Sequence, residues 1–298
     1  MNSQLSEAIQ LCAAEIRPTL TEIVEVADFC GVIHAADVQL LLDALGADGD
    51  QLMAALLPLA KSYATPPISR FYVGAVCRGA SGNLYLGGNM EFPSQTLGAT
   101  IHAEQAAITH AWLHKEKRVD AIAINGTPCG HCRQFMNELV GAAQLQIMTP
   151  RLGKCTLPEL LPGAFGPDNL QNATGLLHPL DHGLQLPAAA AEPLVAAALA
   201  QANRSYAPYS ANYAGAAVQT IDGAIFAAPY AENAAFNPSL SPLQGALLHL
   251  HLAGRSVEDI QQAALVESTQ SLCSQKEATR ALLASLCAAP LHYFSADV

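Results

Sequence analysis

An internal repeat constrains this sequence more than any other feature. Seven residues recur at a constant offset of 141 positions. In the first copy they are Pro67, Ser69, Tyr72, Gly74, Ala75, Gly82 and Glu91. In the second copy their matches are, in the same order, Pro208, Ser210, Tyr213, Gly215, Ala216, Gly223 and Glu232. Seven identities at one offset indicate two copies of one structural unit. The chain is therefore predicted to contain two related domains.

Around the first copy, the residue pattern predicts alternating strands and helices. Residues 71–77 and 84–87 are predicted to form two strands joined by a turn at 81–83. A helix over 102–114, a buried strand over 121–124, a helix that Pro128 begins and that continues to Val140, and a strand at 147–148 are expected to follow. The order β-β-α-β-α-β predicts a mixed sheet covered by helices, with two helix N-termini brought together.

The N-terminal region is predicted to be helical. Apolar residues recur at helical spacing from Leu5 to Cys12, a second periodic segment over 38–45 stops at Gly46, and residues 47–50 form a turn before 52–59. We expect a helical region over 1–48, a first domain over 49–150, a linker over 151–190 and the second copy over 191–298. The predicted fold class is α/β, with two mixed-sheet, helix-covered (α/β/α) domains after a small helical region.

Charge argues against a nucleic-acid partner. The formal net charge is −11, and residues 1–60 carry nine acidic residues against the single base Arg17. No stretch forms the basic stripe that nucleic-acid binding requires. Neither a basic leader with an apolar run nor an apolar stretch of about 18 residues is found. We expect a cytoplasmic protein with neither a membrane nor a nucleic-acid partner.

The eight cysteines favour thiols and a metal site over a disulfide framework, because only one pair is closely spaced. Five lie in apolar surroundings and are expected to be small buried hydrophobes: Cys12, Cys30, Cys77, Cys155 and Cys287.

One stretch carries residues that suit metal chemistry. His102 and Glu104 open one predicted helix, and Cys129 and Cys132 open the next in a Pro-Cys-x-x-Cys pattern. Imidazole and thiolate are zinc ligands, and amides at a helix N-terminus favour the thiolate form. Three protein ligands leave one coordination position for a water molecule, which Glu104 is close enough to deprotonate. This H-x-E…P-C-x-x-C order is the signature of zinc deaminases.

Other interpretations exist for parts of this pattern. A lone Cys-x-x-Cys is also typical of a redox pair or of half a structural zinc site. His131 is expected to face away from the two cysteines on its helix. The remaining helical histidines are expected to be surface or packing residues: His110, His114, His249 and His251.

The second copy lacks these ligands. Residues 239–248 contain no His, Cys or Glu, and the repeat offset places Gln270 and Cys273 opposite Cys129 and Cys132. One thiol cannot hold a catalytic zinc ion. We expect a structural or interface copy, with Cys273 buried.

At this point the sequence resembles the cytidine deaminases of the long, duplicated, dimeric type. The resemblance covers most of the chain and lies in five strings. They are Phe71 to Ala75, Asn89 to Glu91, His102 to Gln105, Thr127 to Glu138, and Tyr230 to Pro238.

The resemblance implies a hydrolytic reaction and a set of site residues. One Zn²⁺ per subunit would be held by His102, Cys129 and Cys132. Attack of zinc-activated water at C4 of the pyrimidine would yield uridine and ammonia, with Glu104 protonating N3 and then the leaving amine. The resemblance also implies that Asn89 and Glu91 bind the ribose hydroxyls of the substrate. The other implied contacts are Ala103 and the pocket aromatics Phe71, Phe165 and Phe236, of which Phe236 would come from the partner subunit of a homodimer.

Without the resemblance, Asn89 and Glu91 would equally fit an ordinary turn, and Phe71 would equally fit a strand core. The leading hypothesis is a zinc-dependent deaminase of cytidine and deoxycytidine. Alternatives are a deaminase acting on a base within RNA or DNA, a nucleotide deaminase, and a non-catalytic scaffold stabilised by zinc. The carboxylate of Glu91 near the sugar would disfavour a 5′-phosphate.

Overall fold

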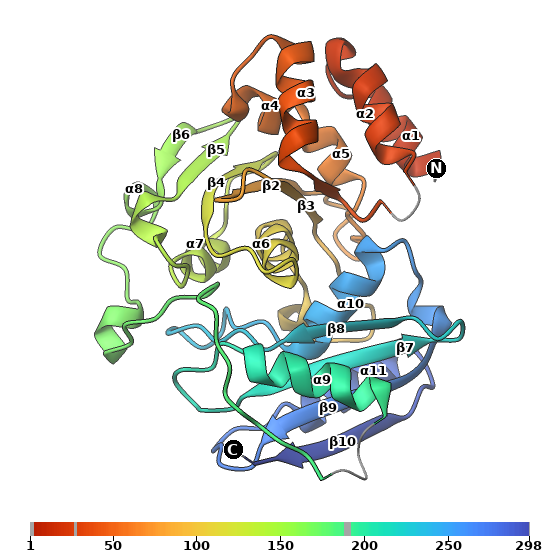
Figure 1. Ribbon diagram of the computed structural model, residues 1–298. Coiled ribbons are helices and arrows are strands. Elements are labelled where there is room, and N and C mark those ends of the chain that lie inside the picture. Colours follow the sequence, from red (N-terminus) through yellow and green to blue (C-terminus); the bar gives the residue numbers. More distant parts are fainter. Residues whose placement is uncertain (1–2, 27–28, 188–191, 298) are drawn as a thin grey trace. The chain divides into compact units, whose positions relative to one another are not determined.

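The computed structural model describes residues 3–26, 29–187 and 192–297 (Figure 1). The chain divides into two compact units. Unit 1 comprises Met1–Glu91 and Thr100–Ala164, and unit 2 comprises Phe92–Ala99 and Phe165–Val298. The division after residue 164 lies inside the segment predicted to be a linker. The segment 92–99 belongs to unit 2, where Gln95 Nε2 donates to the carbonyl of Ala281.

Unit 1 contains a mixed sheet with the strand order β1-β3-β2-β4-β5-β6. Strands β4 and β5 are parallel, and the other neighbours in the sheet are antiparallel. The strands are β1 (Val32–Ile33), β2 (Gly74–Gly79), β3 (Leu84–Gly88), β4 (Val119–Ile124), β5 (Gln146–Thr149) and β6 (Gly153–Thr156). The predicted mixed sheet is therefore confirmed, with β2 and β3 forming the expected hairpin.

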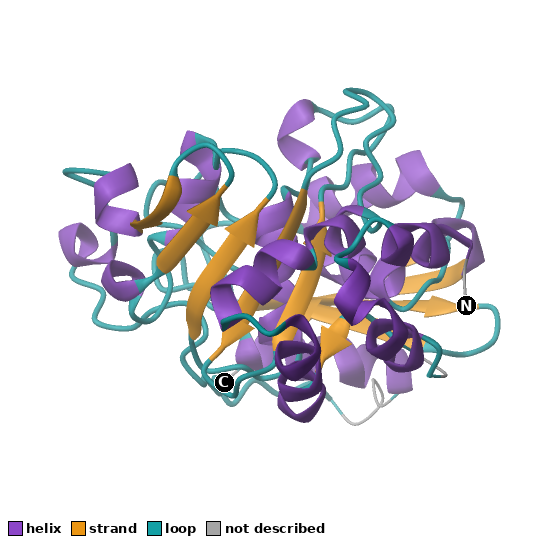
Figure 2. Ribbon diagram, turned by 90° about the horizontal axis from the view of Figure 1, so that it is seen from above, coloured by secondary structure: helices purple, strands orange, loops and turns teal. Residues whose placement is uncertain are grey.

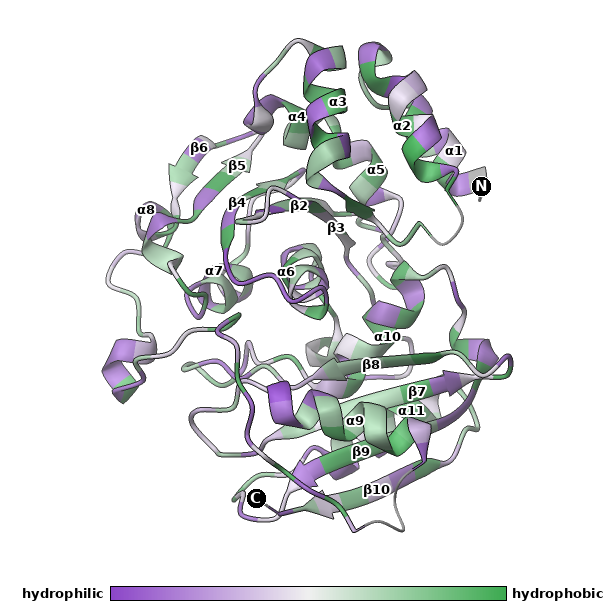
Figure 3. Cartoon of the chain, in the orientation of Figure 1, coloured by the Kyte–Doolittle hydropathy of each residue, from purple (hydrophilic) through white to green (hydrophobic). Residues whose placement is uncertain are grey.

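The helices of unit 1 begin with the predicted N-terminal group. They are α1 (Ser3–Gln10), α2 (Arg17–Val24), α3 (Ala35–Leu45), α4 (Gly49–Ala55), α5 (Leu57–Lys61), α6 (Ala103–Leu113), α7 (Gly130–Met136) and α8 (Leu157–Leu160). Helix α3 ends at Gly46, which adopts a left-handed φ of 62°, and Asp48 caps α4 by accepting from the N–H of Gln51 at 2.9 Å. Hydrophilic and hydrophobic residues alternate along α2 and α3 (Figure 3), as expected for helices with one buried face.

Two consecutive glycines in β3 allow helices to pack closely on both faces of the sheet. Neighbouring residues in a strand point to opposite faces. A Cβ atom on Gly87 would collide with the backbone of Ala107 in α6, whereas one on Gly88 would collide with the backbone at Tyr63 and Ala64, just after α5. Helices α5 and α6 therefore cover opposite faces, and Figure 2 shows strands flanked by helices. This close packing sets the position of α6 against the sheet.

Unit 2 repeats the central part of the unit 1 sheet. Its strand order is β10-β9-β7-β8, with β9 and β10 parallel and the other pairs antiparallel. Its strands and helices are α9 (Pro193–Arg204), β7 (Ala214–Thr220), β8 (Ile225–Pro229), α10 (Pro242–Leu252), β9 (Ile260–Ser268), α11 (Lys276–Leu286) and β10 (Leu291–Ala296). The order β8-β7-β9-β10 matches β3-β2-β4-β5 in direction and sequence, which confirms the internal duplication.

Several local expectations were wrong. Strand β2 begins at Gly74 rather than at residue 71, because the side chain of Asn89 bonds the N–H of Val73 at 2.9 Å and the carbonyl of Phe71 at 3.0 Å. Helix α7 ends at Met136 rather than Val140. The predicted linker contains β6 and α8, because β6 completes the sheet edge by pairing with β5.

The cysteines differ in burial. Cys12 and Cys77 are buried as expected, but Cys30, Cys155 and Cys287 are only partly buried. No helix in the described parts of the chain is long and apolar enough to cross a membrane.

Candidate metal centre and substrate pocket

Helix α6 brings a histidine and a carboxylate to one end of the unit 1 sheet. His102 is the N-cap residue with extended backbone (φ −81°, ψ 155°), and its N–H donates to Gln105 Oε1 at 3.1 Å. Glu104 lies in the first turn and is only 4% exposed. Side chains in a helix point back toward its N-terminus, so both groups are held at the start of α6.

Helix α7 brings two thiols to the same place. Cys129 is its N-cap residue, and the fully buried Cys132 lies in its first turn. Arg133 holds this helix start, donating from Nε to the carbonyl of Pro128 at 2.9 Å and from a guanidinium nitrogen to the carbonyl of Leu160 at 2.8 Å. The sulfurs are therefore presented from a backbone that is fixed on two sides.

The three potential ligand atoms of the cluster converge. His102 Nδ1 lies 3.5 Å from Cys129 Sγ and 3.3 Å from Cys132 Sγ, and the two sulfurs are 3.7 Å apart. Tetrahedral zinc with bonds of about 2.3 Å to sulfur and about 2.05 Å to nitrogen requires edges of about 3.8 Å and about 3.6 Å. The separations fit those edges within about 0.3 Å, so the donor set and its geometry suit zinc.

The surroundings of Cys129 and Glu104 shift the pKa values of both side chains. The 3.7 Å contact between the sulfurs of Cys129 and Cys132, together with the imidazole of His102, lowers the pKa of Cys129 to about 3. Burial raises the pKa of the Glu104 carboxyl. A raised pKa makes this carboxylate a better proton acceptor than a free one.

His131 contacts the cluster through His102, a contact that the helical spacing did not predict. Its ring stacks on that of His102, with ring centres 4.9 Å apart and planes 23° apart. Burial, followed by the charge on His102, lowers the pKa of His131. We infer that this stacking contact restricts rotation of the His102 ring.

A pocket of about 300 Å³ opens beside the cluster, entirely within unit 1. Its walls include most of the residues expected from the sequence: Phe71, Asn89, Glu91, His102, Ala103, Glu104 and Cys129. Sequence reasoning missed five further lining residues: Ser69, Val73, Thr100, Gly126 and Thr127. Ser69 carried a signal because it is one of the repeated residues, and Val73 and Thr127 lie in the strings that carry the family resemblance. Thr100 and Gly126 had no such signal.

Glu91 also holds the loop that contains Ile68 and Ser69, which we call the pocket rim. Its carboxylate accepts from the N–H groups of Ile68 at 2.8 Å and Ser69 at 2.9 Å, and from the hydroxyl of Ser69. Partial burial opposes ionisation, but these donors outweigh it and lower the pKa of Glu91. The carboxylate is therefore held in a fixed position and charged at neutral pH.

Unit 2 repeats this rim. Glu232 accepts from the N–H groups of Tyr209 at 2.9 Å and Ser210 at 3.2 Å, and from the hydroxyl of Ser210. The matched Ser and Glu residues of the repeat thus serve one loop in both units. This loop is a structural element of the domain as well as a wall of the pocket in unit 1.

The helix starts of unit 2 carry different side chains. Ser241 caps α10 as His102 caps α6, and Leu243 occupies the helical position of Glu104. Gln275 is the N-cap residue of α11, so the repeat offset had misplaced the equivalent of Cys129 at Gln270. Cys273 is exposed rather than buried, because it lies in the connection before α11.

In unit 2, the buried carboxylate of Glu267 holds the segment just before helix α11. Glu267 accepts from Asn212 Nδ2 at 3.0 Å, from the N–H of Gln275 at 2.5 Å and from the hydroxyl of Ser274 at 2.9 Å. Hydrogen bonds among side chains and backbone therefore secure this region, in which Glu267 is 2% exposed.

Two expected pocket aromatics lie in unit 2. Phe165 is 48% exposed and Phe236 is 68% exposed, the latter in the connection between β8 and α10 with a left-handed φ of 60°. Their role in a pocket stays a prediction.

The duplicated α/β fold and the cluster of one histidine and two cysteines beside a buried carboxylate define a zinc-binding hydrolase. Profiles described as the cytidine and deoxycytidylate deaminase zinc-binding region match residues 48–149 and 157–280. The chain is 48% identical over 283 residues to a cytidine deaminase of Vibrio cholerae, which covers 95% of each chain. It is also 45% identical over 286 residues to a cytidine deaminase of Serratia proteamaculans, covering 96% of this chain and 97% of the other. The chain belongs to the cytidine deaminase family.

Proposed function

We propose that this protein hydrolyses cytidine and deoxycytidine to uridine and deoxyuridine, with release of ammonia and with one catalytic zinc ion in each chain. The single observation that carries this proposal is the pocket of unit 1, which is lined by His102 and Cys129 of the zinc-fitting cluster and by the buried Glu104. The carboxylate of Glu91 lines the same cavity.

His102 Nδ1 and the sulfurs of Cys129 and Cys132 are the proposed zinc ligands. When bound, zinc acts as a Lewis acid that makes water a nucleophile at neutral pH. Three protein ligands would leave one coordination position available for water, as in catalytic zinc sites. The positions of α6 and α7, fixed by Gly87 and Arg133, keep these ligands converged.

Glu104 is the proposed proton carrier. Its carboxylate takes one proton from the attacking water and delivers it to N3 of the ring. It then takes the second proton from the oxygen added at C4 and passes it to the amine, which leaves as ammonia. Burial supports this role, because it brings the pKa of the carboxyl closer to neutral pH. Water adds and ammonia leaves, so the atoms balance without another reactant.

Asn89 and Glu91 are proposed to bind the sugar hydroxyls, and Phe71 and Ala103 to contact the nucleoside beside them. Glu91 is charged, and a 5′-phosphate close to it would be repelled. The proposal therefore favours nucleosides over nucleotides. The net charge of −11 also disfavours polynucleotides.

We also propose a cytoplasmic homodimer acting in pyrimidine salvage, in which Phe236 of one subunit, together with Phe165, completes a pocket. The exposure of both rings supports this assembly, because a lone subunit leaves them in contact with water. Phe236→Ala should raise KM while leaving zinc content unchanged. Normal KM in Phe236→Ala would contradict the shared pocket.

A side-by-side assay tests the main proposal. Zinc-loaded protein is offered cytidine, deoxycytidine, CMP, dCMP and a C-containing oligonucleotide, and ammonia release is measured. We expect rapid turnover of the two nucleosides alone. Preference for dCMP would overturn the nucleoside assignment, and the absence of all turnover would favour a zinc-stabilised scaffold.

A further inference from the structure

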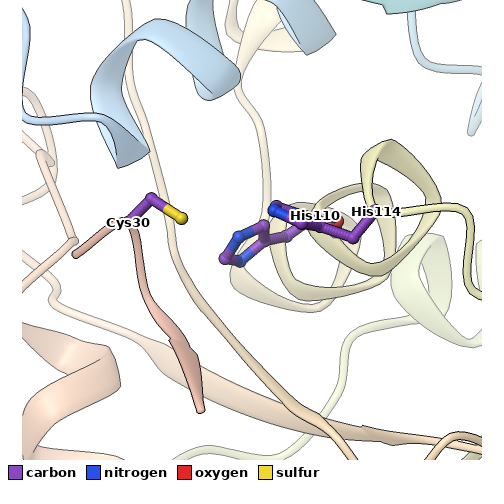
Figure 4. Close-up of side chains that lie close together, drawn as sticks. All are labelled: Cys30, His110 and His114. Atoms are coloured by element: carbon purple, nitrogen blue, oxygen red, sulfur yellow. Dashed lines mark hydrogen bonds between the residues drawn. The ribbon is translucent and has the colours of Figure 1, made fainter. Parts of the chain in front are cut away.

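A second cluster of metal-ligating side chains lies in unit 1, away from the substrate pocket. Potential ligand atoms of Cys30, His110 and His114 lie within 4.8 Å of one another. Figure 4 shows the sulfur of Cys30 facing the imidazole rings carried by α6. His110 lies eight residues after His102, and this is about 12 Å along a helix axis. The two clusters are therefore separate sites.

The two histidines are spaced for metal binding. His110 and His114 are four residues apart, at the end of α6, and such residues lie on one helix face. Their ring centres are 4.9 Å apart. Two imidazoles on one turn can therefore converge on a single ion with little backbone change.

Hydrogen bonds fix the same tautomer in both rings. His110 Nδ1 lies 2.8 Å from the carbonyl of Leu86, and His114 Nδ1 lies 3.0 Å from the carbonyl of His110. A carbonyl only accepts, so each Nδ1 carries hydrogen and each neutral ring has its lone pair on Nε2. Metal-bound histidines commonly donate their other ring nitrogen to a backbone carbonyl in this way.

Cys30 supplies a thiol from a distant part of the sequence. It lies just before β1, which pairs with β3 and so holds this segment beside α6. Cys30 also lines a hollow of about 390 Å³ among the N-terminal helices, and His114 is exposed. Both sides of the cluster are therefore accessible to an ion from solvent.

We propose that Cys30, His110 and His114 bind one divalent transition-metal ion, for which Zn²⁺ is the best match. One thiolate and two neutral imidazoles are ligands that zinc accepts, and a fourth position is left for water or another side chain. The ion would join the N-terminal segment before β1 to the C-terminal end of α6. It would stabilise the helix that carries His102 and Glu104 at its other end, without contacting the substrate.

Metal stoichiometry of the full-length protein tests this site. After zinc loading and removal of loosely bound metal, inductively coupled plasma mass spectrometry should find about two ions per chain. Cys30→Ser and His114→Ala should each reduce this to about one ion while deamination persists, because the proposed catalytic cluster is untouched. Cys155→Ser and His178→Ala are matched controls outside the cluster and should retain the full content.

A variant that lacks both cysteines of the catalytic cluster tests the second metal site independently of the proposed deamination. Cys129→Ser/Cys132→Ser should keep about one zinc ion, and adding Cys30→Ser should remove it. Cobalt loaded into the Cys129→Ser/Cys132→Ser protein should give a single-thiolate charge-transfer band that Cys30→Ser abolishes. Wild-type protein with one ion, unchanged by Cys30→Ser and by His114→Ala, would overturn the second site whether or not deamination is observed.

Discussion

Units 1 and 2 have the same core topology but differ at the starts of two helices. In unit 1, His102 precedes α6 and Cys129 precedes α7, and the ligand atoms converge to within 3.7 Å. In unit 2, the corresponding caps are Ser241 and Gln275. The rim formed by Ser69 and Glu91 is retained as Ser210 and Glu232. The difference indicates that this domain can form its sheet and rim without the proposed metal ligands.

The largest effect is expected from losing a metal ligand in unit 1. Cys129→Ser should release zinc and lower kcat/KM at least about 10⁴-fold, because the Lewis acid is lost. Its far-UV circular dichroism should stay close to that of wild type, since unit 2 forms the same sheet without these ligands. Cys273→Ser, at an exposed cysteine of unit 2, is the control and should retain full activity. Global unfolding of Cys129→Ser would contradict the inference that the fold of unit 1 does not depend on these ligands.

Replacing the carboxylate should leave the metal in place. Glu104→Gln should lower kcat about 10²–10⁴-fold, which is the usual contribution of general acid–base catalysis. Zinc content, measured by mass spectrometry, should be unchanged, because Glu104 is not among the three converging ligands. Loss of zinc in Glu104→Gln would mean that this residue is a ligand.

The two rim glutamates should respond differently. Glu91→Gln should raise KM for cytidine about 10–100-fold, corresponding to the loss of a charged hydrogen bond of about 1.5–3 kcal/mol. Glu232→Gln breaks the equivalent rim in unit 2 and should lower the free energy of unfolding while KM stays normal. Steady-state kinetics and urea denaturation measure both quantities. Equal KM values for Glu91→Gln and wild type would reduce Glu91 to a structural role.

The smallest expected effect is a pH dependence of stability. The pKa of Glu91 is lowered in the folded protein, so its contribution is full above the ordinary value of 4.5 and is lost as pH falls through the folded value. Solvent screening limits this contribution to less than about 1 kcal/mol. Urea denaturation between pH 6 and about pH 3 should show a shallower decline for Glu91→Gln than for wild type. Parallel declines would contradict the assignment.

Local sequence signals predicted the elements that carry the chemistry. Pro128 and the caps at His102 and Cys129 mark helix starts because capping depends on residues within one turn. The repeat predicted the second copy, since matched glycines and loop residues meet the same backbone requirements in both units. The error at Gln270 arose because insertions change the offset between the conserved loop and the later helices.

Contacts between distant segments could not be predicted in this way. The sequence by itself determined the duplication, the two helix starts and the proposed ligand set, because spacing within a turn and repetition at a fixed offset are visible in one dimension. Only the tertiary structure decided that His131 stacks on His102, that Glu91 holds its own rim, and that Cys30 meets His110 and His114. The physical reason is that pairing of β1 with β3, and packing of α6 on the sheet, bring together residues that no local periodicity relates.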